Sequence, residues 1–164
     1  MPILIFDGVC VLCSGVVQFI IKRDAARLFR FASLQSAAGA ALLRQHGLTQ
    51  ADALTSFVVL TAPHAPADNA VLRRSDAALF IARHLAAPWP WLAALGACVP
   101  RALRDLCYAA VAANRYRLFG RHAEGEAGGG GGGSGEEEQC LAPTKAVTAR
   151  FVTLEEAAAL SKAE

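Results

Sequence analysis

Two cysteines near the start of the chain, Cys10 and Cys13, have the C-x-x-C spacing typical of redox-active dithiols and of zinc sites. They follow an apolar run, residues 3–6, that fits a buried strand, and they open a stretch with helical character, residues 11–23. This order places Cys10 at a helix N-terminus, where unpaired backbone N–H groups and the helix dipole stabilise an anion. The sequence therefore predicts that the Cys10 thiolate attacks a target disulfide and that Cys13, further in and less exposed, resolves the mixed disulfide.

Asp7 ends the predicted strand and is a candidate partner of this dithiol. In a partly desolvated site its carboxylate could take the proton of Cys13 during resolution, as a general base. An aspartate at this place could equally cap the turn that precedes the helix. Far along the chain, Arg115, Tyr116 and Arg117 either line the site or form a surface ion-pair cluster.

Other polar residues and thiols are weaker candidates. Ser75 and Asp76 open a predicted helix and could bind the γ-glutamyl end of glutathione, as a Ser-Asp pair does in glutaredoxin-like proteins, although an ordinary N-cap also explains Ser75. Cys140 could be an auxiliary resolving thiol or a third metal ligand, or simply a thiol on a mobile tail. Cys98 and Cys107 fall on apolar helical positions and are predicted to be packing thiols.

The pattern of apolar residues predicts an α/β domain with the order β-α-β-α-β-β-α. This is the layout of a thioredoxin-like three-layer α/β/α fold, here with added C-terminal helices. The predicted strands are residues 3–6, 28–34, 55–61 and 70–74, and the predicted helices are residues 11–23, 35–46, 75–84, 89–98 and 101–113, the last continuing toward Gly120. The apolar stripe of residues 101–113, formed by Leu103, Leu106, Cys107, Ala110 and Val111, predicts a helix packed on that side.

Length, composition and charge limit the possible domain organisation and cellular location of the protein. The 164 residues suit one main domain, residues 1–122, followed by a Gly/Glu-rich disordered linker, 123–138, and a tail, 139–164, with a short amphipathic helix. A net charge of +2 gives no case for nucleic-acid binding. Apolar runs are too short for a membrane span, and no secretory signal is visible, so we expect a cytoplasmic protein, or an organellar one if a targeting segment is missing. Five cysteines in such a chain favour reduced, catalytic or metal-bound thiols over a disulfide framework.

Several motifs together resemble one family. They are Asp7-Gly8-Val9-Cys10-Val11-Leu12-Cys13, the segment 74–78, the segment 100–105, Tyr108 and Asn114-Arg115-Tyr116-Arg117-Leu118-Phe119-Gly120. This combination looks like the DCC family of thiol-disulfide oxidoreductases, which is named for an Asp-x-x-Cys-x-x-Cys motif and assigned a thioredoxin-like fold. The resemblance implies a redox function, with Cys10 and Cys13 as the redox-active pair and Asp7 as the acid of the motif. Cys140 matches a cysteine that members of the family commonly carry after the Asn-Arg-Tyr-Arg segment.

The favoured hypothesis is thus a thiol-disulfide oxidoreductase of the protein-disulfide reductase type. It needs no bound cofactor, and its partners would be a disulfide-containing protein or a low-molecular-weight thiol such as glutathione. Two alternatives stay open: a zinc-binding module built on Cys10, Cys13 and Cys140, and a non-enzymatic thioredoxin-like interaction domain. Thioredoxins place a cis-proline just before the strand that faces the dithiol. Residues 55–56 contain no proline, which argues against substrate docking by the usual backbone pairing.

Overall fold

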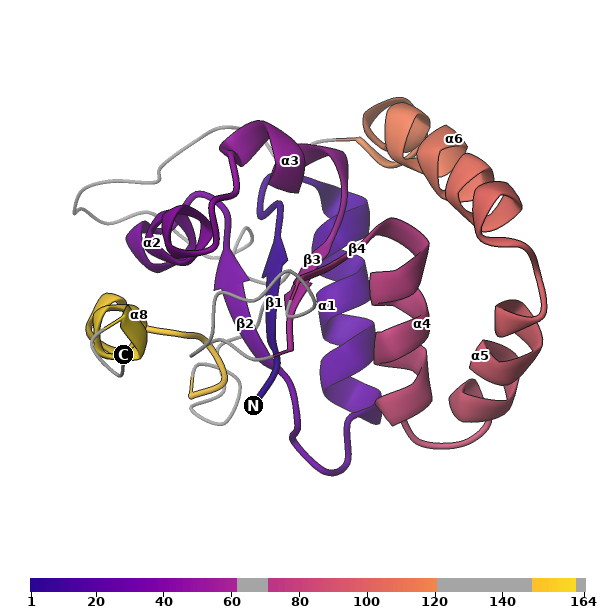
Figure 1. The fold of residues 1–164 in the computed structure, drawn as a ribbon, viewed down its shortest axis with the longest axis horizontal. Helices are drawn as coiled ribbons and strands as arrows, with labels where there is room; N and C mark the ends of the chain where they lie inside the picture. Colours follow the sequence, from indigo (N-terminus) through magenta and orange to yellow (C-terminus); the bar gives the residue numbers. More distant parts are fainter. Residues whose placement is uncertain (62–70, 121–148, 162–164) are drawn as a thin grey trace, which may run out of the picture.

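The structure of the chain, a computed structural model, describes residues 1–61, 71–120 and 149–161. A four-stranded sheet has helices on both of its faces (Figure 1). The strands are β1 (Ile3–Phe6), β2 (Arg30–Ser33), β3 (Val58–Leu60) and β4 (Val71–Arg73). The helices are α1 (Val11–Arg23), α2 (Ala37–Gln45), α3 (Gln50–Thr55), α4 (Arg74–His84), α5 (Trp89–Ala97), α6 (Arg101–Phe119) and α8 (Leu154–Ser161).

The sheet has the strand order β2-β1-β3-β4. β1 and β2 are parallel and are joined through α1, with Ile3 opposite Arg30 and Phe6 opposite Ser33. β3 runs antiparallel to both β1 and β4. A parallel β-α-β unit followed by an antiparallel hairpin and a helix is the predicted thioredoxin-like α/β fold, which the structure confirms.

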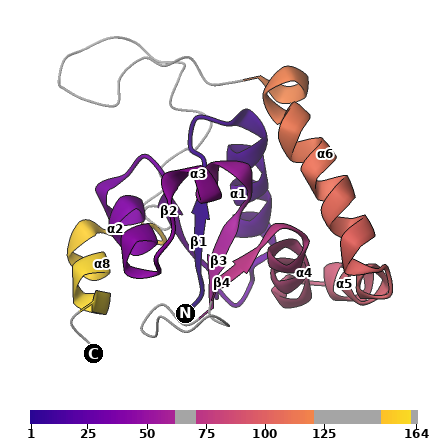
Figure 2. The ribbon, with the colours of Figure 1, turned by 45° about the horizontal axis from the view of Figure 1, so that its top comes forward.

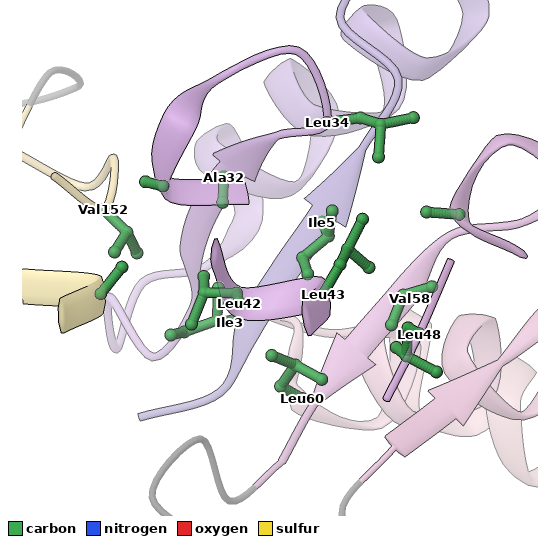
Figure 3. Packing of buried hydrophobic residues seen from close by; sticks show 13 residues of the cluster. Ile3, Ile5, Ala32, Leu34, Leu42, Leu43, Leu48, Val58, Leu60 and Val152 are labelled. Carbon is green, nitrogen blue, oxygen red and sulfur yellow. The ribbon is translucent and has the colours of Figure 1, made fainter. Parts of the chain in front are cut away.

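Side chains of β1 alternate between the two faces of the sheet, because successive residues of a strand point in opposite directions. Ile3 and Ile5 belong to a core cluster with residues of α2, α3 and α8, and Figure 3 shows this packing. Leu4 and Phe6 belong to a second cluster with residues of α1 and α4. This second cluster also contains Cys10 and Cys13, so the dithiol lies in the core on the α1 face of the sheet.

Helices α5 and α6 lie outside the layer formed by α1 and α4, on the side away from the sheet (Figures 1 and 2). The side of α6 that meets this layer is polar and aromatic, and it includes Arg104, Tyr108 and Arg115. The opposite side carries exposed apolar residues: Leu103 and Leu106 are 52% and 67% exposed. Val111, which belongs to the predicted stripe, is also 49% exposed but lies on the same side as Tyr108 and Arg115. The prediction that this stripe is packed is therefore wrong, as is the prediction that Cys98 and Cys107 are packing thiols, since both are exposed.

The C-terminal segment that the structure describes packs on the same fold. Phe31 of β2 donates its N–H to the carbonyl of Arg150, and Val152 donates its N–H to the carbonyl of Phe31, both at 2.9 Å. Arg150 forms an ion pair with Asp24, whose side chain is fully buried. Helix α8 then lies against α2, as both views show (Figures 1 and 2).

Most predicted boundaries shift by one or two residues, and two differences matter for the site. Thr55 belongs to α3, a helix that the sequence did not predict, so β3 is shorter than the expected strand. Helix α4 begins at Arg74, which places Ser75 inside its first turn rather than at the N-cap. The predicted linker, 123–138, and Cys140 lie outside the described residues and stay predictions. Of the helices described, none is both long and apolar enough to cross a membrane.

Candidate active site

Cys10 is the N-cap residue of α1, with an extended backbone (φ −84°, ψ 118°). Its N–H donates to the carbonyl of Asp7 at 3.3 Å, and its own carbonyl accepts the N–H of Ser14 at 3.0 Å, which begins the helix. The predicted placement of Cys10 at a helix N-terminus is thus confirmed. The predicted difference in exposure is wrong, because Cys10 is 0% exposed and Cys13 is 5% exposed. Both are free thiols.

Cys13 has a strongly perturbed acidity. Burial raises the pKa of its thiol to about 12, and a hydrogen bond to Cys10 and the charge of Cys10 act in the same direction. The Arg115 guanidinium partly opposes this rise, and the Asp7 carboxylate adds a little to it. Cys13 therefore keeps its proton at neutral pH while it is hydrogen-bonded to Cys10.

Asp7 is buried, with an exposed fraction of 3%, and both of its carboxylate oxygens accept hydrogen bonds. Oδ1 accepts the N–H of Val9 at 3.1 Å, the turn contact expected for an aspartate here, and Nε2 of Gln35 at 2.8 Å. Oδ2 accepts the hydroxyl of Tyr116 and Nη2 of Arg115, the latter at 3.5 Å. A buried carboxylate is thus held by a guanidinium, a phenol and an amide.

Helix α6 supplies three of the residues around the dithiol. Arg115 and Tyr116 were predicted either to line the site or to form a surface cluster, and the structure brings both onto Asp7. Arg117, named with them, is exposed. Tyr108 accepts the N–H of Phe57 at 2.9 Å through its hydroxyl, a contact that sequence reasoning missed. Its only signal in the sequence was its place among the motif residues quoted above.

The chain just before β3 is also bonded to α6. Arg115 donates from Nη2 to the carbonyl of Leu54, and Tyr108 holds the N–H of Phe57. These backbone groups lie in the segment where thioredoxins present a cis-proline and pair with an extended substrate. In this chain, side chains of α6 already hydrogen-bond these backbone groups.

A cavity of about 360 Å³ adjoins the dithiol between α1, α4, α5 and α6. Cys13, Asp7 and Arg115 contribute to its wall, and Cys10 does not. Most of the remaining wall is apolar and includes Phe19, Ile81, Leu85 and Trp89. The described structure therefore offers a route to the dithiol through an apolar space that meets the sulfur of Cys13.

Ser75 and Asp76, predicted as a possible glutathione site, interact with α6 instead. The hydroxyl of Ser75 donates to Oδ1 of Asp105 at 2.5 Å, and this hydrogen bond lowers the pKa of the Asp105 carboxyl. Asp76 forms ion pairs with Arg101 at 2.8 Å and with Arg104 at 3.5 Å. Both side chains thus have partners within the chain.

The predicted alternative of a zinc site is not visible in the described part of the chain. No three His, Cys, Asp or Glu side chains among residues 1–61, 71–120 and 149–161 are arranged to hold a metal ion. Cys140, the third ligand of that hypothesis, lies outside these ranges.

Comparisons with known proteins identify the family of the chain. The DCC1-like thiol-disulfide oxidoreductase family matches residues 4–121. The uncharacterized protein YuxK of Bacillus subtilis is 39% identical over 150 residues, which cover 92% of this chain and 93% of that protein. A chloroplastic DCC family protein of Arabidopsis thaliana is 42% identical over 120 residues, 73% of this chain and 66% of that protein. No solved structure shows significant similarity to the chain. The chain that places Cys10, Cys13 and Asp7 together in this way belongs to the DCC1-like thiol-disulfide oxidoreductase family.

Proposed function

We propose that the protein is a disulfide reductase that works through Cys10 and Cys13. The observation that carries this proposal is the state of the pair at the start of α1. Cys10 is the N-cap residue, at the end of the helix that favours anions, and Cys13 is hydrogen-bonded to it and holds its proton. This arrangement supports Cys10 as the attacking sulfur and Cys13 as the resolving thiol.

The exchange would proceed in two steps. The Cys10 thiolate attacks one sulfur of a substrate disulfide, forms a mixed disulfide and releases the first substrate thiolate, which takes up a proton from solvent. The sulfur of Cys13 then loses its proton and attacks Cys10, which forms the Cys10–Cys13 disulfide and releases the second substrate thiol. Asp7 lies on the same cavity wall as Cys13 and is proposed as the acceptor of that proton. A cellular thiol returns the pair to the reduced state.

Burial of Cys10 sets a condition on the first step. Since its side chain is fully covered, a disulfide reaches its sulfur only when residues around the start of α1 move. Cys13 faces the cavity and is hydrogen-bonded to Cys10, so a substrate that enters there arrives beside both sulfurs. We therefore expect opening on this side of α1 to precede attack.

The test is a redox titration of the dithiol. The protein is equilibrated in buffers of reduced and oxidised dithiothreitol, free thiols are alkylated, and peptide masses report which cysteines are paired. We expect one reversible transition that pairs Cys10 with Cys13 and is lost in Cys10→Ser and in Cys13→Ser. Reduction of a small disulfide such as hydroxyethyl disulfide should be lost in Cys10→Ser, and Cys13→Ser should accumulate a mixed disulfide on Cys10.

The matched control is the double variant Cys98→Ser/Cys107→Ser, which removes two exposed thiols and should leave the transition unchanged. Absence of any Cys10–Cys13 transition in the native protein would refute the proposal. So would stoichiometric zinc in the purified protein that disappears in Cys140→Ser, because it would assign the thiols to a metal site.

A further inference from the structure

The cavity beside Cys13 lies along α1, and we call it the slot. Its α1 wall extends from Leu12 to Ile20, eight residues, or roughly 12 Å at the rise of an α-helix. Phe19 on this wall packs edge-to-face on Trp89 of α5, with ring centroids 4.7 Å apart. A volume of about 360 Å³ is in the range of sites for small molecules.

The polar groups of the cavity gather where Cys13 lies. Asp7 has partners on both of its oxygens, so it offers little to a ligand. Arg115 differs: its Nε is buried and has no hydrogen-bond acceptor among the described residues. A buried N–H without a partner is costly. Since Arg115 is one of the residues that line the cavity, an oxygen of a ligand there that reaches Nε would satisfy this group.

Two kinds of substrate fit this arrangement poorly. An extended peptide would need the backbone groups before β3, but Tyr108 holds the N–H of Phe57 and Arg115 holds the carbonyl of Leu54. Glutathione disulfide is polar and charged, whereas most of the slot wall is apolar. The Ser75–Asp76 pair that would receive its γ-glutamyl end is bonded to α6.

From these contacts we infer that the substrate is a low-molecular-weight disulfide with an apolar substituent and a hydrogen-bond acceptor a few bonds from sulfur. The substituent occupies the slot along α1 and α4, the acceptor bonds to Nε of Arg115, and the disulfide lies against Cys13. This inference rests on the proposed function. The reaction balances as Cys10-SH plus Cys13-SH plus R-S-S-R giving the Cys10–Cys13 disulfide and two R-SH, with two electrons and two protons passing to the substrate.

The probes are two neutral diamides of dithiodipropionic acid, one with N-butyl groups and one unsubstituted. They share the disulfide and the carbonyl acceptors and differ only in the apolar chains. Because burial of each CH₂ favours binding by roughly fourfold, we expect kcat/KM for the butyl diamide to exceed that of the unsubstituted diamide by at least about tenfold. Turnover is followed by chromatography as conversion of each diamide disulfide to its thiol, with dithiothreitol as the reductant and the rate without protein subtracted.

A matched pair of variants tests the position of the chain. Ala112 lines the cavity, and Ala113, one residue further along α6, is exposed. Ala112→Phe should fill the slot and abolish the preference for the butyl diamide, whereas Ala113→Phe should retain it. Ala82→Leu fills the slot from α4 and repeats the test if Ala112→Phe does not fold.

The outcomes separate this inference from the proposed function. Equal kcat/KM for the two diamides in the native protein overturns the inference and leaves the proposed reductase function intact. A preference for the butyl diamide that both Ala112→Phe and Ala82→Leu retain has the same consequence. Failure of the dithiol to equilibrate with dithiothreitol overturns the proposed function itself.

Discussion

The ion pair between Asp7 and Arg115, which lies beside the dithiol, should be costly to break. Nη2 and Oδ2 are 3.5 Å apart, and the two side chains are 8% and 3% exposed, so solvent screens them weakly. Coulomb's law with an effective dielectric of 20 gives about 5 kcal/mol for unit charges at this separation. Removal of one member of a buried pair typically costs about 3 to 5 kcal/mol, because the other charge stays buried without its partner. We expect Arg115→Met to lower the free energy of unfolding by that amount.

Urea denaturation of a double-mutant cycle measures this coupling. Asp7→Asn should also destabilise the fold, since it leaves the Arg115 guanidinium buried without a counter-charge. The double variant Asp7→Asn/Arg115→Met should lose less than the sum of the single variants, by about 2 kcal/mol or more. Arg117→Met, two residues away on the exposed side of α6, is the control and should change stability by less than about 0.5 kcal/mol. Strict additivity of the two single effects would refute the reasoning.

The remaining predictions concern packing and pH. Leu106→Ala should lower the free energy of unfolding by less than about 0.5 kcal/mol, because Leu106 is 67% exposed. Leu34 is 2% exposed, so Leu34→Ala should lower it by about 2 to 5 kcal/mol in urea denaturation. Equal losses of stability in the two variants would contradict the exposure of Leu106 on α6. Gly39→Ala should destabilise the fold by about 1 to 3 kcal/mol, because the new Cβ would lie 2.1 Å from a backbone carbonyl oxygen. Gly15→Ala, at a position on α1 with open space, should stabilise it by about 0.5 kcal/mol. The thermal midpoint should therefore fall in the first variant and rise in the second. A hydrogen bond from Arg30 of β2 lowers the pKa of Glu156 from 4.5 to about 2. The contribution of this carboxylate to the free energy of unfolding is therefore present above pH 4.5 and is lost as the pH falls toward 2. Since this side chain is 44% exposed, Glu156→Gln should cost no more than about 1 kcal/mol at pH 7 and nothing near pH 2; a constant cost across this range would refute the assignment.

Local sequence sufficed for the parts of the site that local contacts build. The order of a buried strand, a turn, two cysteines and a helix placed Cys10 at the N-cap of α1, because strand burial and helix initiation depend on neighbouring residues. The same kind of signal located β4 and α4 to within a few residues and gave the thioredoxin-like order of elements. Asp7 could be recognised as a candidate because it directly follows β1 and precedes the dithiol.

Contacts between distant segments had no such signal. The relative exposure of Cys10 and Cys13 came out reversed, because it depends on what α4, α5 and α6 place against α1. Arg115 pairs with Asp7 across 108 residues of sequence, and Tyr108 bonds to the chain before β3 across 51. The apolar side of α6 was expected to pack, yet its polar side faces the fold.

The sequence by itself therefore determined the β-α-β-α-β-β-α order, the dithiol at a helix start and the family to which the chain belongs. Only the tertiary structure decided which side of α6 faces the site, and with it the surroundings of the dithiol. The physical reason is that Asp7 and Asp76 are carboxylates that need cationic partners, and the arginines of α6 supply them. Helical periodicity shows where the apolar residues of α6 lie, but the carboxylates that face the helix, above all the buried Asp7, determine which side turns inward.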